Sequence, residues 1–559
     1  MKKRTKAISI LLALIMLITV CPITAVTVSA ADETVYTCGI YEYTLTYEGA
    51  AIVGCNGTDR SLTIPSTLDG NKVVEIGECV FLGAALDSLT IPEGVTTIRQ
   101  FALADSEITD ISFPKSLKNV EEGAFDDAAF LVEAKKKSDF YIVGDGLLYW
   151  YNKNNLNIVV PDTVKTIPEW LFNSCFADTV VLSENITEIP VGAFRDSEFT
   201  SITLGSNVRY IYYYAFADCA KLENITIPDS VQSLAFNAFQ NCTSLKYADL
   251  GKIQNIGSSL FENCTSLESL TLPDGIIEIR DAAFKGCTAL DNIVIPDGCT
   301  KIDKYAFQDC TSLKNLTVPK SVKSIEGYAF DNTPFLENHR EKYVILGDEV
   351  LVKYNGTDRK VNIPDGVKKI APYVFNSNEI IEQVTIPDTV TEIGTCAFDS
   401  SGIRDLKLPK NLEIIGLSAF RNCKNLTEVA IPGSVKLIKE QAFFLCSSLK
   451  TIVVPRSVEE IRIHAFTFTW SDDEAVVYGF EGSYIQQYAA EKNLTFSVLP
   501  DEGDINADGK VGLIDAVTAQ KAAIQSVSLD ILKTAVADIN GDLSVTIFDA
   551  ISIQKLSLQ

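Results

Sequence analysis

Oxygen-bearing side chains recur twice near the C-terminus, at a spacing that suits a hard cation. Residues 504–515 are D-I-N-A-D-G-K-V-G-L-I-D and residues 538–549 are D-I-N-G-D-L-S-V-T-I-F-D. Oxygens at loop positions 1, 3, 5 and 12, with a backbone carbonyl at position 7, provide the cage that Ca²⁺ prefers. The sequence therefore predicts two calcium sites, one formed by Asp504, Asn506, Asp508, Asp515 and the Lys510 carbonyl, the other by Asp538, Asn540, Asp542, Asp549 and the Ser544 carbonyl.

The two loops differ at position 6, where a sharp turn normally requires glycine. The first loop has Gly509 there and the second has Leu543. A side chain in that backbone conformation costs free energy, so we expect the second site to be strained and to bind calcium more weakly. Gly512, at position 9 of the first loop, offers no side-chain ligand, and a water molecule would take its place.

Each loop is followed by an apolar segment that predicts a helix ending in Gln-Lys, and the two copies lie 34 residues apart. This near-symmetric duplication, with Asp at position 12 of both loops, resembles a type I dockerin across residues 503–559. The resemblance implies a small all-α module that folds with calcium and then binds a cohesin domain of a scaffoldin. It also implies the residues that face the cohesin: Leu513, Ile514, Gln520, Lys521, Ile547, Phe548, Gln554 and Lys555.

Most of the chain that precedes these loops is built from a repeat. Residues 267–288 show it plainly as L-x-x-L-T-L-P-D-G-I-x-x-I-x-x-x-A-F-x-x-C-T. We call one such unit a coil. The residue that closes its strand-like part recurs from Pro65 to Pro455, mostly every 22 or 23 residues. A single coil cannot bury its apolar residues alone, so coils must stack with the strand Leu and Ile, the V-x-x-I segment and the Phe inside. We expect one continuous sheet.

Two longer gaps interrupt this period. They contain the related segments Y-I-V-G-D-G-L-L-Y at 141–149 and Y-V-I-L-G-D-E-V-L at 343–351. Each gap is close to two repeat lengths, so the stack keeps its phase. The sequence predicts an extra hairpin-like pair of strands in each.

The repeated text across residues 38–466 resembles the BspA-like leucine-rich repeats of bacterial surface antigens. That resemblance implies an α/β-type solenoid, mostly β with short helical turns, that binds proteins or surfaces without catalysis. We therefore expect four parts: residues 1–30 as a signal peptide, 31–466 as the solenoid with two irregular insertions, 467–499 as a C-terminal cap and 500–559 as the dockerin. In the cap, Ser483 predicts a helix start, Asn493 its end after Lys492, and residues 494–499 a returning strand.

Eight of the 14 cysteines lie three residues after the repeated Phe, where other coils have Ala, Ser or Thr. A position that accepts these residues is small and buried, and a free Cys packs there as a small hydrophobe. Disulfides between coils or a metal site are the alternatives. Cys38 and Cys55, in the irregular first coil, are the better disulfide candidates.

The composition disfavours several classes of partner and of enzyme. The net charge is −25, which disfavours nucleic acid and anionic membranes as partners. Only two His occur, His339 and His464, so zinc sites with several His and triad hydrolases have few possible members. Lys2 to Lys6, the apolar run 7–20 and Val28-Ser29-Ala30 predict a secretory signal. No other segment is long enough to span a membrane, so we expect a secreted, extracellular protein.

The residues two and four positions before the closing residue point outward and are mostly Thr, Ser, Asn and Asp. The expected function is that of a secreted, non-catalytic, cellulosome-associated protein acting in polysaccharide catabolism, whose dockerin binds a cohesin. Its repeats would hold an unidentified protein, cell-surface or substrate ligand. The alternative is an enzyme or protease inhibitor delivered to the cellulosome, with its site in the irregular insertions at 131–160 and 335–363. Assays of the dockerin-free repeats on polysaccharides, peptides and proteases would separate the two.

Overall fold

The computed structural model describes residues 34–466 and 475–558. The predicted signal peptide, residues 1–30, lies outside the described residues. The chain divides into two compact units. The first comprises residues up to Ser138 together with Val143–Asp145, and the second comprises Asp139–Ile142 and the residues from Gly146 onward.

The first unit begins with an antiparallel meander and continues as parallel coils. Strand β1 (Tyr36–Cys38) pairs with β2 (Tyr41–Leu45), which pairs with β3 (Ala50–Cys55). Two parallel ladders follow, one in each half of the coil. They consist of β4 (Ser61–Thr63), β7 (Ser88–Thr90) and β9 (Asp110–Ser112), and of β6 (Asn71–Ile76), β8 (Thr97–Ile98) and β10 (Asn119–Val120), with β5 (Thr67–Leu68) beside β6 and helix α2 (Ala129–Lys135) after them.

The disulfide prediction for the first coil is wrong. Cys38 is in β1 and Cys55 is in β3, and both are register partners of Tyr41 in the strand between them. Two strand spacings separate the cysteines by about 9–10 Å, beyond the reach of a disulfide. Both thiols are free in the structure.

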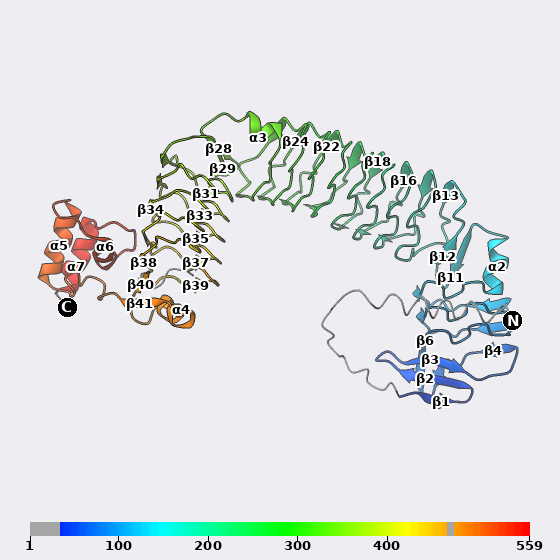
Figure 1. Ribbon diagram of the computed structural model, residues 1–559. Coiled ribbons are helices and arrows are strands. Elements are labelled where there is room, and N and C mark those ends of the chain that lie inside the picture. Colours follow the sequence, from blue (N-terminus) through cyan, green and yellow to red (C-terminus); the bar gives the residue numbers. More distant parts are fainter. Residues whose placement is uncertain (1–33, 467–474, 559) are drawn as a thin grey trace. The chain divides into compact units, whose positions relative to one another are not determined.

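The second unit repeats one coil, and β18 (Asn224–Thr226) with β19 (Ser233–Leu234) is typical of it. The first strand alternates exposed, buried, exposed, because its central Ile225 points inward. The V-x-x-I segment supplies the second strand. Figure 1 shows the strands of successive coils side by side. The ladder of first strands runs through β13 (Asn157–Val159), β14 (Thr179–Val181), β16 (Ser201–Thr203), β18, β20 (Tyr247–Asp249), β22 (Ser269–Leu270), β24 (Asn292–Val294), β26 (Asn315–Thr317), β30 (Lys360–Asn362), β32 (Gln383–Thr385), β34 (Asp405–Lys407), β36 (Glu428–Ala430) and β38 (Thr451–Val453), with breaks after β22, β26 and β34.

The expectation of one continuous sheet is therefore wrong. Each coil contributes two short strands, and each strand pairs with the equivalent strand of the next coil. Two parallel ladders therefore run through the stack, and each ladder is interrupted where successive strands are not paired. The second ladder consists of two-residue strands, which are too short to show the alternation of buried and exposed residues by which a strand is predicted from sequence. Its members are β15 (Glu188–Ile189), β17 (Tyr210–Ile211), β19, β21 (Asn255–Ile256), β23 (Glu278–Ile279), β25 (Lys301–Ile302), β27 (Ser324–Ile325), β31 (Lys369–Ile370), β33 (Glu392–Ile393), β35 (Ile414–Ile415), β37 (Leu437–Ile438) and β39 (Glu460–Ile461).

The repeated Phe side chains form the spine of the core. From Phe172 to Phe330 and again from Phe375 to Phe466, rings of successive coils stack at centroid distances of 4.8–5.7 Å and interplanar angles of 4–13°. Offset stacking adds about 0.5–1.5 kcal/mol per pair beyond the burial of apolar area. The inward Phe of each coil was predicted, and it is confirmed.

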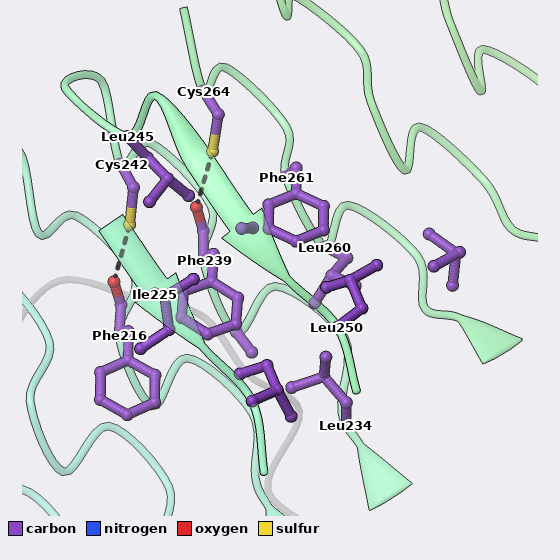
Figure 2. Packing of buried hydrophobic residues seen from close by; sticks show 14 of the residues in the cluster. Phe216, Ile225, Leu234, Phe239, Cys242, Leu245, Leu250, Leu260, Phe261 and Cys264 are labelled. Atoms are coloured by element: carbon purple, nitrogen blue, oxygen red, sulfur yellow. Dashed lines mark hydrogen bonds between the residues drawn. The ribbon is translucent and has the colours of Figure 1, made fainter. Parts of the chain in front are cut away.

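The small position after the Phe is buried in most coils, as predicted, and at seven of its cysteines it also donates a hydrogen bond. The Sγ atoms of Cys242 and Cys264 donate to the carbonyls of Phe216 and Phe239 of the preceding coil, both at 3.1 Å (Figure 2). Ser197 makes the same bond to Phe172 at 2.9 Å. Burial raises the pKa of Cys242 well above its usual value, which keeps this donor protonated.

The segment around each Phe is a series of hydrogen-bonded turns rather than a helix. The residue two before the Phe has positive φ in many coils, for example Ala282 (54°), Tyr305 (60°) and His464 (59°). The residue before the small position does so too, as in Asn241 and Asn263, both at 60°. Two left-handed residues per coil reverse the chain before a helix can extend.

The two insertions contain the expected pairs of strands, each preceded by a short helix. Strands β11 (Phe140–Val143) and β12 (Leu147–Tyr151) form a two-stranded sheet. After α3 (Pro334–Asn338), β28 (Tyr343–Leu346) and β29 (Val350–Tyr354) pair antiparallel, and β29 continues into the ladder through β31. The stack thus keeps its phase through this insertion.

The C-terminal end of the stack is covered by β40 (Val476–Gly479), α4 (Tyr484–Lys492) and β41 (Thr495–Val498). The predicted helix bounds are correct, and Asn493 ends α4 with a left-handed φ of 54°. Ser483 precedes the helix but does not cap it, since its hydroxyl donates to the Phe480 carbonyl at 2.6 Å. Strands β40 and β41 extend the ladder of β38 in parallel.

Candidate functional site

The first predicted calcium loop folds around two buried carboxylates. Asp504 accepts the backbone N–H groups of Asp508 at 3.1 Å and Gly509 at 2.8 Å. Asp515 accepts those of Asn506 at 3.0 Å and Gly512 at 2.9 Å. These bonds link positions 1 and 12 to the intervening backbone, so the loop is closed around its acidic ends.

The second loop repeats this geometry. Asp538 accepts the N–H groups of Asp542 at 3.1 Å and Leu543 at 2.6 Å. Asp549 accepts those of Asn540 at 3.3 Å and Thr546 at 2.9 Å, together with the Thr546 hydroxyl at 2.8 Å. The duplication seen in the sequence is therefore a duplication in structure.

Three helices hold the loops. Helix α5 (Leu513–Ala523) follows the first loop, α6 (Ile531–Ala537) precedes the second and α7 (Ile547–Leu556) follows it. Asp515 and Asp549 lie in the first turns of α5 and α7, where the helix dipole favours a negative charge. A small core of Ile505, Ala516, Ala519, Ala537, Ala550 and Ile553 joins the two halves.

The donor set fits a hard cation, because it consists of oxygen atoms alone. The electrostatics of the second loop favour one as well. Burial, followed by the nearby charges of Asp542 and Asp549, raises the pKa of Asp538 to about 6, against the backbone N–H groups that lower it. A bound Ca²⁺ would offset this cost of holding the carboxylates ionised. Each loop would hold it through the predicted residues, and the metal would supply the positive charge that fixes the loop.

The carboxylates alone do not make a metal centre. Within residues 34–466 and 475–558, no three Asp, Glu, His or Cys side chains form a group that could hold a metal ion. Each predicted ligand set also needs an Asn side chain, Asn506 or Asn540, and a carbonyl, that of Lys510 or Ser544. Full coordination of calcium by these residues remains a prediction.

Leu543 occupies the strained conformation expected from its position. Its φ is 58°, and the equivalent Gly509 has a φ of 86°. The left-handed region costs a residue with a side chain about 1–2 kcal/mol. The weaker binding of calcium at the second site stays a prediction.

The residues predicted to face a cohesin lie at the surface. At the starts of α5 and α7, Leu513 and Ile514 are 70% and 67% exposed, and Ile547 and Phe548 are 49% and 74% exposed. Farther along the helices, Lys521, Gln554 and Lys555 are exposed and Gln520 is half-buried. The two apolar pairs are exposed to solvent at equivalent places in the two halves of the module. Exposed apolar side chains that lie together are typical of a protein-binding site.

The outward face of the repeats is polar, as predicted. In β18, Asn224 and Thr226 are exposed on either side of the buried Ile225. In the second insertion, the His339 Nδ1 atom lies 3.1 Å from the Glu341 Oε2 atom. These two residues also line a hollow together with Phe335 and Asn338 of the same insertion.

Comparisons with known proteins match two families along the chain. The description "BspA type Leucine rich repeat region (6 copies)" matches residues 59–177, 146–253, 250–342 and 353–470, and "Dockerin type I domain" matches residues 502–556. No curated protein matches the chain. Within the described residues, no helix has the length and apolarity needed to cross a membrane.

Several solved structures are similar to the chain. A leucine rich cell surface protein from Faecalibacterium prausnitzii is 24% identical, with 82% of this chain and 98% of that one covered and a TM-score of 0.27. A leucine-rich repeat protein from Bacteroides ovatus is 20% identical, with 83% and 99% covered and a TM-score of 0.26. One from Eubacterium ventriosum is 19% identical, with 54% and 96% covered and a TM-score of 0.29.

Proposed function

We propose that this chain, which belongs to the BspA type leucine-rich repeat family and ends in a type I dockerin, is a secreted, non-catalytic component of a cellulosome-like assembly. The dockerin attaches the protein to a cohesin of a scaffoldin, and the repeats present a binding surface. The observation that carries the proposal is the pair of matching loops, each with two exposed apolar residues at positions 10 and 11.

Calcium controls the attachment in this proposal. Leu513 and Ile514 are positions 10 and 11 of loop 1, and Ile547 and Phe548 are the same positions of loop 2, so the metal fixes the first turn of each docking helix. Position 12 of each loop lies in that same turn. Without metal, the like charges within each loop repel and the apolar pairs lose their common orientation. The dockerin is small, and its core of six buried residues supplies little stability of its own.

The repeats supply a long, polar and chemically regular surface. Thr, Ser and Asn dominate its outward positions, which suits hydrogen bonding to a protein partner. Large aromatic side chains, which stack on sugar rings, are scarce there, so a protein or cell-surface ligand is favoured over a polysaccharide.

The test is capture of the full chain on a panel of immobilised cohesins, with Ca²⁺ and with a chelator. Replacement of Leu513, Ile514, Ile547 and Phe548 by Asp together should abolish capture. The matched control is Ile524→Asp, because Ile524 is 72% exposed in the same module but outside the proposed surface. Capture that survives the fourfold change, or that is lost equally in the control, would contradict the proposal.

A further inference from the structure

The two calcium loops are near-duplicates, but their surroundings differ. In the first loop, residues 507–510 are all exposed. In the second, the equivalent residues 541–544 are all partly buried. The covering surface belongs to the last coils of the repeats, which lie in the same compact unit as the dockerin.

The closest approach is between two glycines. The N–H of Gly433 donates to the Gly541 carbonyl at 2.8 Å. A Cβ atom on Gly433 would lie 3.0 Å from the Gly541 Cα atom, and one on Gly541 would lie 2.9 Å from the Gly433 Cα atom. The two backbones can meet at this distance only because neither residue has a side chain.

Apolar contacts surround this point. Leu543 packs against the core of the last coils, and Val536 of α6 is buried with Val453 of β38 and with Phe480 and Leu499 of the cap. Val453 is only 3% exposed. At the same outward position of other coils, Val159 and Val294 are 62% and 67% exposed. The dockerin and the cap thus cover together a position that is open to solvent in these other coils.

The coil and the dockerin loop that meet here each depart from the pattern of their own repeat. Of the sixteen residues that follow a closing position, Gly433 is the only glycine, and the others are Asp, Glu, Lys, Arg or Ser. In the dockerin, position 4 changes from Ala507 to Gly541 and position 6 from Gly509 to Leu543. These departures, read from the sequence alone, coincide with the contact.

The connection is also short. Asp504, the first residue of loop 1, comes six positions after Val498, the last residue of β41. Gly503 between them donates its N–H to the Val536 carbonyl of α6 at 2.7 Å. A connection of this length keeps the dockerin beside the cap and lowers the entropic cost of the contact.

We propose that the last coils form a binding surface for the chain's own second calcium loop and α6, with Leu543 as its anchor. Contact with the coils offsets the strain of a Leu at position 6, so that docking and filling of the second site stabilise each other. The apolar pairs at the starts of α5 and α7 stay exposed, and the dockerin is presented to its partner in a fixed orientation. Only the metal part of this inference rests on the calcium sites proposed above.

The test uses the full chain with Leu543→Gly, Gly433→Asp and the double variant. Leu543→Gly gives the loop the residue that loop 1 already has, and Gly433→Asp gives the coil a residue found in other coils, so neither disrupts its own repeat. In saturating Ca²⁺, each single variant should speed hydrogen exchange in residues 428–436 and 538–546 by about tenfold, which is near the lower end of what burial of a Leu contributes, because Leu543 is partly buried. Residues 504–512 serve as the internal control and should not change.

Calcium titration calorimetry provides a second test, because Leu543→Gly should change the calcium affinity of the second site in opposite directions in two backgrounds. In the otherwise unaltered chain, Leu543→Gly should weaken the second site, because the anchor is lost. In the Gly433→Asp background the contact is already broken, so the same change should strengthen the site about fivefold by relieving backbone strain.

The outcomes separate the two proposals. Unchanged exchange in both single variants, or Leu543→Gly acting in the same direction in both backgrounds, would overturn the docking inference. A chain that takes up no calcium but still shows the exchange differences would overturn the calcium sites and leave the docking contact in place.

Discussion

Replacement of Asp549 by Ala tests the calcium loops most sharply, because this carboxylate is fully buried and holds the second loop together. It accepts N–H groups from Ile539 at 3.1 Å, Asn540 at 3.3 Å and Thr546 at 2.9 Å, and the Thr546 hydroxyl at 2.8 Å. A hydrogen bond to a charged group contributes about 1.5–3 kcal/mol. Loss of only two such bonds would cost at least about 3 kcal/mol, which corresponds to more than about a hundredfold in affinity.

Calcium titration calorimetry on the full chain measures the effect directly. We expect Asp549→Ala to abolish the second binding event and to leave the first in place. Asp530→Ala is the matched control, because Asp530 is exposed and only caps α6 by accepting the N–H of Lys533 at 2.8 Å. It should cost about 1 kcal/mol of helix stability and no calcium site. Two unaltered binding events in Asp549→Ala would refute the assignment of position 12.

Three further predictions concern the repeats and the pH dependence of metal binding. Phe261→Ala should lower the free energy of unfolding in urea by about 3–5 kcal/mol, since its buried ring stacks on Phe239 at 5.6 Å and Phe284 at 5.7 Å; Phe176→Ala, at a side chain 62% exposed, should change it little. Cys264→Ser should keep the bond to the Phe239 carbonyl and unfold near the unaltered temperature, whereas Cys264→Val leaves that carbonyl with the N–H of Cys242 at 3.3 Å and should cost about 0.5–1.5 kcal/mol; equal melting temperatures would show that the donor is unimportant. Because Asp538 has a raised pKa of about 6 when metal-free, protons should compete with Ca²⁺ at the second site below that pH, weakening it about tenfold per unit of pH. The metal-free module should instead gain stability as the pH falls through 6, because its folded form takes up the proton before the unfolded chain does; a calcium affinity that is flat between pH 7 and 5 would contradict both statements.

The sequence predicts the repeated elements well because each is stated many times. The inward Ile225 and the Phe spine follow from apolar spacing that recurs coil after coil. The cap helix Tyr484–Lys492 was placed correctly because Ser483 and Asn493 mark its ends. The donor at the small position also had a signal, since Cys, Ser and Thr share a hydrogen-bonding group that Ala lacks.

Other features depend on tertiary geometry that a single sequence does not encode plainly. The second ladder is built of strands of two residues, which have no period to detect. Tyr305 and His464 adopt left-handed φ values without the Asn or Gly that usually marks them. The sequence makes Cys38 and Cys55 candidates for a disulfide, but in the structure Tyr41 of the middle strand lies between them in the strand register.

Leu543 and Gly433 combine a feature that the sequence predicts with one that it does not predict. The departure of Leu543 from glycine predicts strain, and its φ of 58° agrees with that. The surface that covers Leu543 was not foreseen, although Gly433 already broke the pattern of its repeat. Departures from an internal repeat are therefore worth comparing in pairs, because two of them can mark one contact.

The most direct measurement is the affinity of the full chain for a type I cohesin, by calorimetry, in Ca²⁺ and after chelation. We predict binding in Ca²⁺, none after chelation, and none for a chain carrying both Asp515→Ala and Asp549→Ala. Binding of equal strength without metal, or no binding to any cohesin tested in Ca²⁺, would contradict the account.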